Sequence, residues 1–262
     1  MNVVFSNISA GLIFNGKAYG ELAFEGEDLD RYIRFFADKT PDILALSEVH
    51  LEDTEGNSVM AAQIGRELGL PYCKVEYMHP SHLDTSMQMG NAILSAYPIV
   101  SSKPFDLTAP PLTVDRPDGK RWHMHDKKAQ QATLDTPDGL LDVINLTYFP
   151  FHHFNRRMDD SDFAKIRKRL VDFLLAESTN PKVIAADFNN KNVPLRAGFP
   201  ELFKAGFREA VLAPTTVVGY TDQQLDHLLY QPAHFLATDD FAEQNGSDHY
   251  AIGAALRRLT SG

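Results

Sequence analysis

Short apolar segments bounded by turn-forming residues recur from one end of the chain to the other. Eight of them, each five to seven residues long, are rich in Val, Ile and Leu, which is typical of β-strands, several of them buried on both faces. These segments are residues 2–8, 43–47, 91–95, 131–135, 140–145, 182–186, 225–230 and 250–256. Between them, residues 28–37, 59–68 and 163–175 place apolar side chains on one face at helical spacing, which predicts three amphipathic helices.

Two copies of the tripeptide Pro-Asp-Gly, at 117–119 and 137–139, predict turns, and the second is expected to join two strands as a hairpin. No linker-like, low-complexity or repeated stretch interrupts the pattern. We therefore expect one domain over residues 1–262, in which mixed strands and helices form either an α/β or an α+β layered fold.

The composition is that of a globular protein with a sizeable core, because 44% of the 262 residues are apolar and an ordinary 23% are charged. The single cysteine, Cys73, cannot form an internal disulfide, which is compatible with a reducing compartment. No apolar run approaches the roughly 18 residues of a membrane span, and residues 1–14 lack the basic leader and cleavage signal of a secretory peptide. These features predict a cytoplasmic protein.

The charge balance bears on the choice of partner. The chain has 25 Lys and Arg against 35 Asp and Glu, a net charge of −10. Such a balance weighs against tight, sequence-blind binding to duplex DNA, which draws most of its affinity from basic residues. A phosphate substrate is still compatible, because a divalent cation held by acidic residues becomes the largest local charge.

Polar residues that could carry chemistry follow the predicted strands, where a rigid scaffold can aim them at a ligand. Glu48 comes directly after the apolar segment Asp-Ile-Leu-Ala-Leu-Ser. A carboxylate in that place is costly to bury unless it is paired or ligates a cation. Asn7 closes the segment Val-Val-Phe-Ser-Asn, and by itself it is typical of a turn after a strand.

A stronger motif is Lys-Val-Ile-Ala-Ala-Asp-Phe-Asn-Asn, in which Asp187 and Asn189 stand two residues apart at the end of a predicted strand. Alternate residues of an extended segment share a face, so the carboxylate and the amide are expected to point into the same site. Together they could bind metal, water or phosphate. The alternative is an Asx turn.

Two Asp-His dipeptides, Asp226-His227 and Asp248-His249, lie near the C-terminus. An Asp and a His from separate segments can form a base and its orienter, because the carboxylate fixes the imidazole tautomer and raises its basicity. Either dipeptide alone is a weak signal, since structural His–Asp pairs are common.

Taken in order, these motifs resemble the endonuclease/exonuclease/phosphatase superfamily of metal-dependent phosphodiesterases and phosphatases. The resemblance spans nearly the whole chain. Its elements are Asn7, Leu-Ser-Glu48, Gly-Asn-Ala-Ile-Leu-Ser at 90–95, Ala-Asp187-Phe-Asn189, Leu-Asp226-His-Leu and Ser-Asp248-His249. The resemblance implies an α/β (α+β) fold, a four-layered αββα sandwich of two mixed β-sheets flanked by helices, with the site at one rim.

The resemblance also implies a metal site. Glu48 would be the principal ligand of a Mg²⁺ (or Mn²⁺) ion, with Asn7 beside it and Asp248 completing the metal or phosphate contacts. A hard cation of this kind prefers oxygen ligands, keeps several waters and polarises a phosphoryl oxygen, so the residue types agree with the assignment.

The catalytic roles implied by the resemblance fall on four other residues. Asp187 would activate or orient the attacking water, and Asn189 would hold a phosphate oxygen. His249 would act as the general base or as a phosphate-binding imidazole, oriented by Asp226.

The chain departs from the family at one position. Where the family usually has Asn-Thr-His-Leu, this chain has Asn145-Leu-Thr147-Tyr, so the expected phosphate-stabilising histidine is Thr147. Two histidines follow, His152 and His153. We expect one of them to supply the missing imidazole, and we favour His153 because it shares strand parity with position 147. The alternatives are that both are solvent-facing loop residues or that the site has lost a donor.

Two other groups are not assigned to the site. Trp122, His123 and His125 follow the first Pro-Asp-Gly and are interpreted as part of a loop or hairpin rather than as a metal site. Lys127 and Lys128 are interpreted as solvated or phosphate-facing.

The leading hypothesis is a divalent-metal-dependent hydrolase of phosphate esters without an organic cofactor. Its substrate would be either a nucleic acid or a small or lipid phosphodiester, and the negative charge favours a small or exposed substrate. The alternative is a non-catalytic binding module that retains the fold and has lost the chemistry, which the Thr147 departure makes worth considering.

Overall fold

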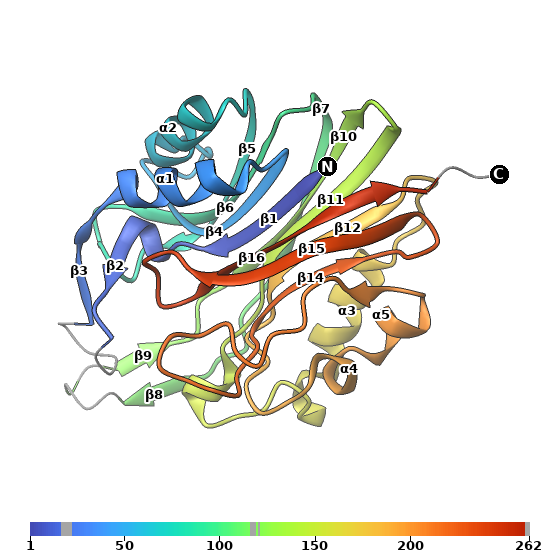
Figure 1. Cartoon of the computed structure of the whole chain (residues 1–262). Helices are drawn as coiled ribbons and strands as arrows, with labels where there is room; N and C mark the ends of the chain where they lie inside the picture. Colours follow the sequence, from blue (N-terminus) through green and yellow to red (C-terminus); the bar gives the residue numbers. More distant parts are fainter. Residues whose placement is uncertain (17–22, 116–118, 120, 260–262) are drawn as a thin grey trace.

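Two six-stranded mixed sheets form the centre of the protein (Figure 1). The computed structural model describes residues 1–16, 23–115, 119 and 121–259. The first sheet has the strand order β15-β16-β1-β4-β6-β5, and the second has the order β13-β14-β12-β11-β10-β7. In each sheet one neighbouring pair is parallel, β1 with β4 and β11 with β12, and the other neighbours are antiparallel.

The strands of the first sheet are β1 (Asn2–Asn7), β4 (Ile43–Leu51), β5 (Tyr72–Pro80), β6 (Gln88–Ser95), β15 (Phe235–Gln244) and β16 (Tyr250–Arg258). Those of the second are β7 (Ile99–Leu107), β10 (Lys127–Thr136), β11 (Gly139–Thr147), β12 (Lys182–Asp187), β13 (Arg208–Glu209) and β14 (Asp226–Tyr230). Two small hairpins add β2 (Leu12–Phe14) with β3 (Phe24–Glu27), and β8 (Thr113–Asp115) with β9 (Arg121–His123).

The α-helices are α1 (Leu29–Lys39), α2 (Val59–Leu68), α3 (Ala164–Leu174), α4 (Leu195–Gly198) and α5 (Pro200–Lys204). Three short 3₁₀ segments are η1 (Ser9–Gly11), η2 (Phe151–Phe154) and η3 (Ser161–Phe163). The three predicted helices therefore form; both ends of the second are as predicted, and the ends of the other two differ by one or two residues. Among the helices of the described ranges, none has the length and hydropathy that crossing a membrane requires.

Local capping fixes where the two N-terminal helices begin. The Asp28 carboxylate accepts a hydrogen bond from the Arg31 amide at 3.0 Å, and the Ser58 hydroxyl accepts one from the Ala61 amide at 3.1 Å. Each cap satisfies an amide at the helix N-terminus that has no partner within the helix. α2 ends at Gly69, whose φ of 68° suits a residue without a Cβ.

Three apolar layers show how the elements stack. Residues of α1 and α2, such as Phe36 and Ile64, pack with Leu44 on the outer face of the first sheet. A second cluster lies between the sheets, and a third packs α3 and α5 on the outer face of the second sheet. The protein is thus the expected sandwich of helices, sheet, sheet and helices, with α1 and α2 on one side and α3 to α5 on the other (Figure 1).

The hairpin predicted at the second Pro-Asp-Gly is present, because β10 and β11 pair antiparallel with Thr136 opposite Gly139. Of the first Pro-Asp-Gly, residues 117 and 118 lie outside the described residues. The strands that flank it, β8 and β9, form a hairpin.

Side-chain hydrogen bonds join the two sheets near the ends of β4 and β11. The Asn145 amide donates to the carbonyl oxygens of Leu46 at 2.8 Å and Ala92 at 2.9 Å. The Thr147 hydroxyl lies 3.0 Å from Ser47 Oγ and 3.1 Å from Asn91 Oδ1. Buried polar groups satisfied in this way fix the relative position of the sheets at the rim where the candidate site lies.

Candidate active site

The predicted site residues lie at one rim of the sandwich because of the strand directions. β1 and β4 are parallel and β16 is antiparallel to β1, so Asn7 at the end of β1, Glu48 near the end of β4 and His249 just before β16 lie at the same edge of the first sheet. β12 and β14 are antiparallel, so Asp187 at the end of one lies directly opposite Asp226 at the start of the other. The topology therefore brings residues 242 positions apart, 7 and 249, into one site.

Hydrogen bonds across the gap between the sheets hold the rim together. The Asn7 amide donates to Asp187 Oδ2 at 3.4 Å, and the backbone amide of Ser9 donates to Asn7 Oδ1 at 3.1 Å. Across the same gap, His249 Nδ1 lies 2.8 Å from Asp226 Oδ2. These contacts fix side chains from both sheets around one centre.

The backbone at Glu48 is unusual. The pairing of β4 with β6 shifts register between Leu46 and Val49, and Glu48 itself has a φ of 57° in the left-handed region. Such a conformation is unfavourable for a side-chain-bearing residue, and bulges of this kind re-aim a side chain next to functional sites. The half-buried Glu48 lines the cleft and makes no hydrogen bond or ion pair with a described residue.

Asp187 and Asn189 share the site, but a turn directly after β12, rather than the expected extended segment, brings them together. Asp187 Oδ1 accepts from the Asn189 backbone amide at 2.9 Å, and Asp187 Oδ2 accepts from the Asn189 side chain at 3.0 Å. The same side chain donates to the Tyr148 carbonyl at 3.0 Å, and Asn189 has a φ of 49°. The Asx turn considered as an alternative is therefore present, and it orders Asp187 at the cleft rather than replacing a site.

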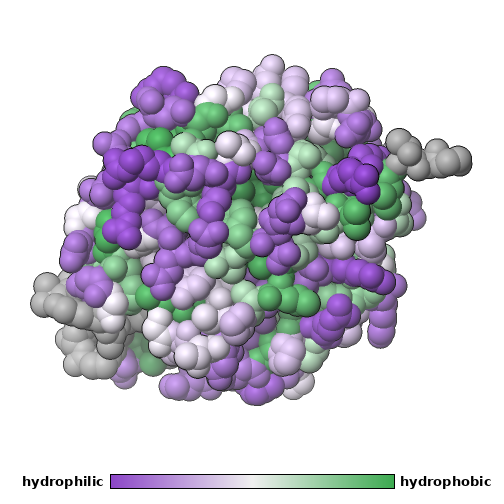
Figure 2. Space-filling view, viewed as in Figure 1, coloured by the Kyte–Doolittle hydropathy of each residue, from purple (hydrophilic) through white to green (hydrophobic). Residues whose placement is uncertain are grey.

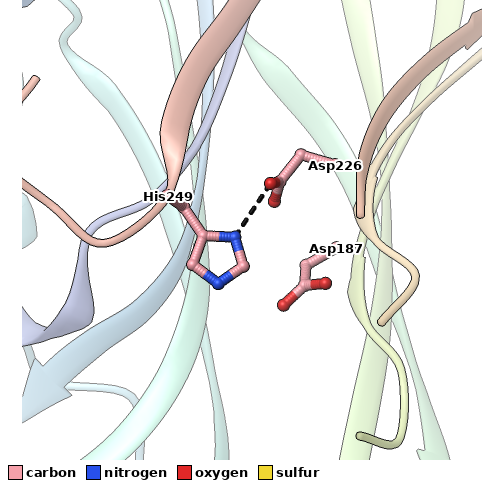
Figure 3. A group of neighbouring side chains, drawn as sticks. All are labelled: Asp187, Asp226 and His249. Carbon is pink, nitrogen blue, oxygen red and sulfur yellow. Dashed lines mark hydrogen bonds and ion pairs between the residues drawn. The ribbon is translucent and has the colours of Figure 1, made fainter. Parts of the chain in front are cut away.

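The pKa values of Asp187 and His249 are both raised above the ordinary values of these groups. Burial raises the pKa of Asp187 to about 7; His249 opposes this, and the charges of Asp226 and Glu48 add to it. Burial alone would lower the pKa of His249, but the charge and hydrogen bond of Asp226 outweigh it and hold that pKa well above its ordinary value. In Figure 3 the imidazole faces Asp226, and Asp187 lies beside them. A carboxylate able to take a proton thus adjoins an imidazolium able to donate one.

Asp248 is held at the same centre. Its Oδ1 lies 2.5 Å from Ser9 Oγ and 3.1 Å from Ser247 Oγ, and the residue lines the cleft. His227, the other histidine of the Asp-His dipeptides, is different. Its ring is 2.9 Å from Glu209 and 3.1 Å from Asn190, and it is not among the lining residues, so its role is structural.

A cleft of about 790 Å³ opens over these residues. Among the described residues that line it, five carry a carboxylate and one carries an amine. These are Glu25, Glu48, Asp115, Asp187 and Asp248, and Lys127. A phosphate ester entering such a cleft meets repulsion unless a cation neutralises part of the negative charge.

One wall of the cleft is made of rings. Trp122 lies 5.4 Å from His153, 5.7 Å from Phe154 and 6.3 Å from His82 between ring centroids, and the His82 ring is stacked on His125 at 6.5 Å. Of the predicted loop or hairpin, Trp122 lies in the hairpin strand β9 and His125 in the loop that follows it. Both line the cleft, which the sequence did not indicate. Figure 2 shows the mixture of polar and apolar residues on one face of the molecule.

Thr147 does not take the place of the family's histidine. Its side chain is fully buried against Ser47 and Asn91 and does not line the cleft. His153 does line it, whereas His152 does not. Both histidines are half-buried, so they are not the solvent-facing loop residues considered as an alternative. Burial, and then the charge of Lys191, lower the pKa of His153 to about 4, so its ring is neutral near pH 7.

The residues present fit a hard divalent cation. Three groups near the centre offer oxygen atoms, Glu48, Asn7 and Asp248, and Glu48 makes no hydrogen bond with the part of the chain that the structure describes. A second cluster of potential metal ligands consists of Asp187, Asp226 and His249. Each offers one ligand atom, and these atoms lie within 4.8 Å of one another. His249 Nδ1 faces Asp226 rather than an open position, which favours a catalytic role for that group.

Comparison with known proteins places the chain in a family. The model of the Endonuclease/Exonuclease/phosphatase family matches residues 15–249, and the chain belongs to this family. Comparison of the sequence with curated proteins gives no match.

Solved structures share the fold over nearly the whole chain. An endonuclease/exonuclease/phosphatase from Beutenbergia cavernae has a TM-score of 0.71 at 17% identity, over 98% of this chain and 71% of that one. The human Nocturnin catalytic domain with bound sulfate has a TM-score of 0.64 at 16% identity, over 99% and 93% of the two chains. A mannosyl-6-phosphatase from Bacteroides thetaiotaomicron has a TM-score of 0.59 at 15% identity, over 98% and 99%. These similarities confirm the predicted fold.

Proposed function

We propose that the protein is a hydrolase of phosphate esters that depends on Mg²⁺ or Mn²⁺. The observation that carries the proposal is the Glu48 carboxylate, held in a strained backbone conformation at an acidic cleft with no hydrogen-bonding partner among the described residues. Strain of this kind persists where the surrounding fold enforces it, and it is concentrated at functional sites. Glu48, Asn7 and Asp248 would hold the ion, which supplies Lewis-acid polarisation of the phosphoryl group and activation of a bound water.

The other residues of the site accept a proton from water or bind the charged phosphate. Asp187, with its pKa raised to about 7, accepts the proton of the attacking water. His249 donates a charge-assisted hydrogen bond to the phosphate, because Asp226 keeps its imidazole protonated and oriented. This assignment decides between the two roles that the sequence left open for His249, in favour of phosphate binding.

Asn189 and His153 complete the donor set. Both N–H groups of the Asn189 side chain are used on Asp187 and the Tyr148 carbonyl, so Asn189 holds a phosphate oxygen by exchanging one of these bonds for it. The neutral imidazole of His153 replaces the donor missing at Thr147. The charge of a phosphoryl transition state spreads over several oxygens, so donors on more than one side each contribute.

A small phosphate ester is the favoured substrate. The five lining carboxylates disfavour a long polyanion, and the ring wall around Trp122 can contact the apolar or planar part of a small alcohol. A mannosyl-6-phosphatase and a 2′,3′-cyclic phosphatase, ANGEL2, are among the proteins of similar fold, and both names describe phosphatases.

A panel of phosphate monoesters, phosphodiesters and short oligonucleotides tests the proposal, assayed for product with Mg²⁺, with Mn²⁺ and with chelator. We expect hydrolysis of at least one small ester that chelator abolishes and added metal restores. Hydrolysis that is unaffected by chelator would contradict the metal dependence. Binding of phosphate esters without any hydrolysis would favour the non-catalytic binding module instead.

A further inference from the structure

Lys127 is the only lysine or arginine among the described residues that line the cleft. It is the first residue of β10, and its side chain lies almost entirely within the protein, because the residue is only 7% exposed. It forms no ion pair with a described carboxylate. An amine in this situation is costly, since burial of a charge is unfavourable unless the charge is paired.

Among the described residues, His79 makes the contact that orients Lys127. Burial lowers the pKa of His79 to about 2, so its imidazole is neutral. His79 Nδ1 lies 2.8 Å from the Pro80 carbonyl and must therefore carry the proton, which leaves Nε2 as an acceptor. Lys127 Nζ, 3.4 Å from that Nε2, donates to it. His79 thus positions the amine and leaves its other N–H groups available.

Lys127 lies at the same edge of the second sheet as Thr147, the position where the family usually has a histidine. β10 runs antiparallel to β11, with Ala129 opposite Leu146, so the first residue of β10 and the last residue of β11, Thr147, lie at the same edge of the sheet. Burial lowers the pKa of Lys127, while the charges of Glu48 and Asp187 raise it, so both carboxylates act on the amine electrostatically. The amine is therefore near the reaction centre without contacting either acid.

We propose that Lys127 is a phosphate-binding catalytic residue, whose Nζ contacts a non-bridging oxygen of the substrate phosphate on the side where the family's histidine is absent. The inference rests on the proposed function and extends it by one residue. A bound phosphate supplies the anionic partner that the buried amine otherwise lacks. Lys127 also brings a positive charge to this side of the phosphate, which the neutral ring of His153 does not.

A competing role for Lys127 is to act only as a counterion that offsets the crowded carboxylates. The two roles differ in what happens when the amine is removed. If Lys127 contacts phosphate, its loss removes a charge-assisted hydrogen bond and weakens phosphate binding more than the loss of a nearby charge alone would. Loss of a mere counterion weakens phosphate binding by no more than the factor by which it tightens cation binding. In both cases a divalent cation binds more tightly, because a like charge near Glu48 and Asp187 is gone.

The experiment measures inorganic phosphate binding by isothermal titration calorimetry to the Mg²⁺-loaded protein and to Lys127→Met, Lys127→Arg and Lys128→Met. Lys128 is the matched control, because it lies next in the chain, pairs with Asp106 at 3.1 Å and does not line the cleft. We expect Lys127→Met to weaken phosphate binding about 10- to 100-fold, the effect of losing a hydrogen bond to a charged group. Lys127→Arg should retain most of the affinity, and Lys128→Met all of it.

A Mn²⁺ titration of the same variants guards against a folding defect. Lys127→Met should bind Mn²⁺ roughly three- to tenfold more tightly than the wild type. A damaged site would lose affinity for both ligands, so opposite changes exclude a folding defect. A phosphate affinity in Lys127→Met that falls by no more than the Mn²⁺ affinity rises, or a wild-type protein that binds no phosphate, would overturn the proposal. Phosphate binding that requires Lys127 in a protein with no hydrolytic activity would support this inference and contradict the proposed function.

Discussion

At the scale of single residues, Asp226 and His249 come from different sheets and meet in one hydrogen bond of 2.8 Å. Groups that act as a unit have effects that are far from additive. We expect His249→Ala and Asp226→Asn each to lower kcat by about 10²-fold or more, and the double variant to be little worse than His249→Ala. Steady-state kinetics of the three variants measure this. A double variant that shows the product of the two single losses would mean that the residues act independently.

The pair of Asp226 and His249 also predicts the direction in which the stability of the protein changes with pH. The folded-state pKa of His249 is raised above its unfolded value of about 6.5. The stability contributed by the pair is therefore fully present near pH 6 and is lost as the pH rises through the folded-state pKa. Denaturant unfolding of wild type and Asp226→Asn in chelator should show a stability deficit of the variant that shrinks as the pH is raised from neutral. A deficit that grows over that range would contradict the charged pair.

His153 is the residue whose role the sequence predicted most indirectly, from a histidine missing at Thr147. If its imidazole donates to the transition state, His153→Ala should lower kcat by about 10²-fold with little change in KM. His152→Ala is the control, because His152 does not line the cleft although its ring lies 4.2 Å from that of His153. Wild-type kcat in His153→Ala would leave Lys127 as the donor on that side of the phosphate.

Residue types limited what could be predicted at this scale. Glu48, Asp187, Asn189 and His249 stand out because a polar group at the end of an apolar strand needs a reason. Lys127 does not stand out, because lysines are mostly exposed and the burial of one depends on the elements packed around it. A sequence carries no local signal for such burial.

At the scale of elements, the bulge in β4 connects the fold to the chemistry. Glu48→Gln keeps the size of the side chain and removes the charge, so we expect loss of activity without loss of structure. In chelator its melting temperature should equal or exceed that of the wild type, because one of the repelling carboxylates near Asp187 is gone. Circular dichroism measures the melting temperature of Glu48→Gln, and the phosphate-ester hydrolysis assay measures its activity. An active Glu48→Gln protein would remove Glu48 from the role of principal metal ligand.

The strands that the sequence predicted and the strands that it missed differ by position in the sheets. The predicted ones are interior strands, whose faces are buried and whose residues form apolar runs. Four missed strands, β5, β15, β7 and β13, are the edges of the two sheets. Edge strands are commonly polar or interrupted, and β7 carries Lys103 and Pro104 in its middle. Their sequences therefore resemble loops even though they pair as strands.

The four-layer arrangement itself was predicted from the family resemblance rather than from periodicity. Periodicity left α/β and α+β open, because it indicates which face of each element is buried and not which element covers it. Asn145 illustrates the difference: it reads as an ordinary polar residue late in a strand, and in the structure it joins β11 to carbonyl groups of β4 and β6. Such long-range pairings appear only when the sheets are assembled.

At the scale of the whole molecule, the net charge of −10 and the cleft lined by five carboxylates both favour the binding of a cation. The two sheets concentrate acidic residues at one rim, and the repulsion among them is the condition under which a divalent cation binds well. Substrate and metal binding are then coupled, because the cation reduces the negative potential that a phosphate ester meets on entering.

The most direct test of the metal-dependent mechanism is an anomalous difference map from a crystal soaked in Mn²⁺, measured with and without inorganic phosphate. We predict one strong peak within about 2.0–2.3 Å of the Glu48 carboxylate, bounded by Asn7 and Asp248. Phosphate, where added, should lie between that peak and His249. A map without a peak in the cleft, or with its peak enclosed by Asp187, Asp226 and His249 and away from Glu48, would contradict the account.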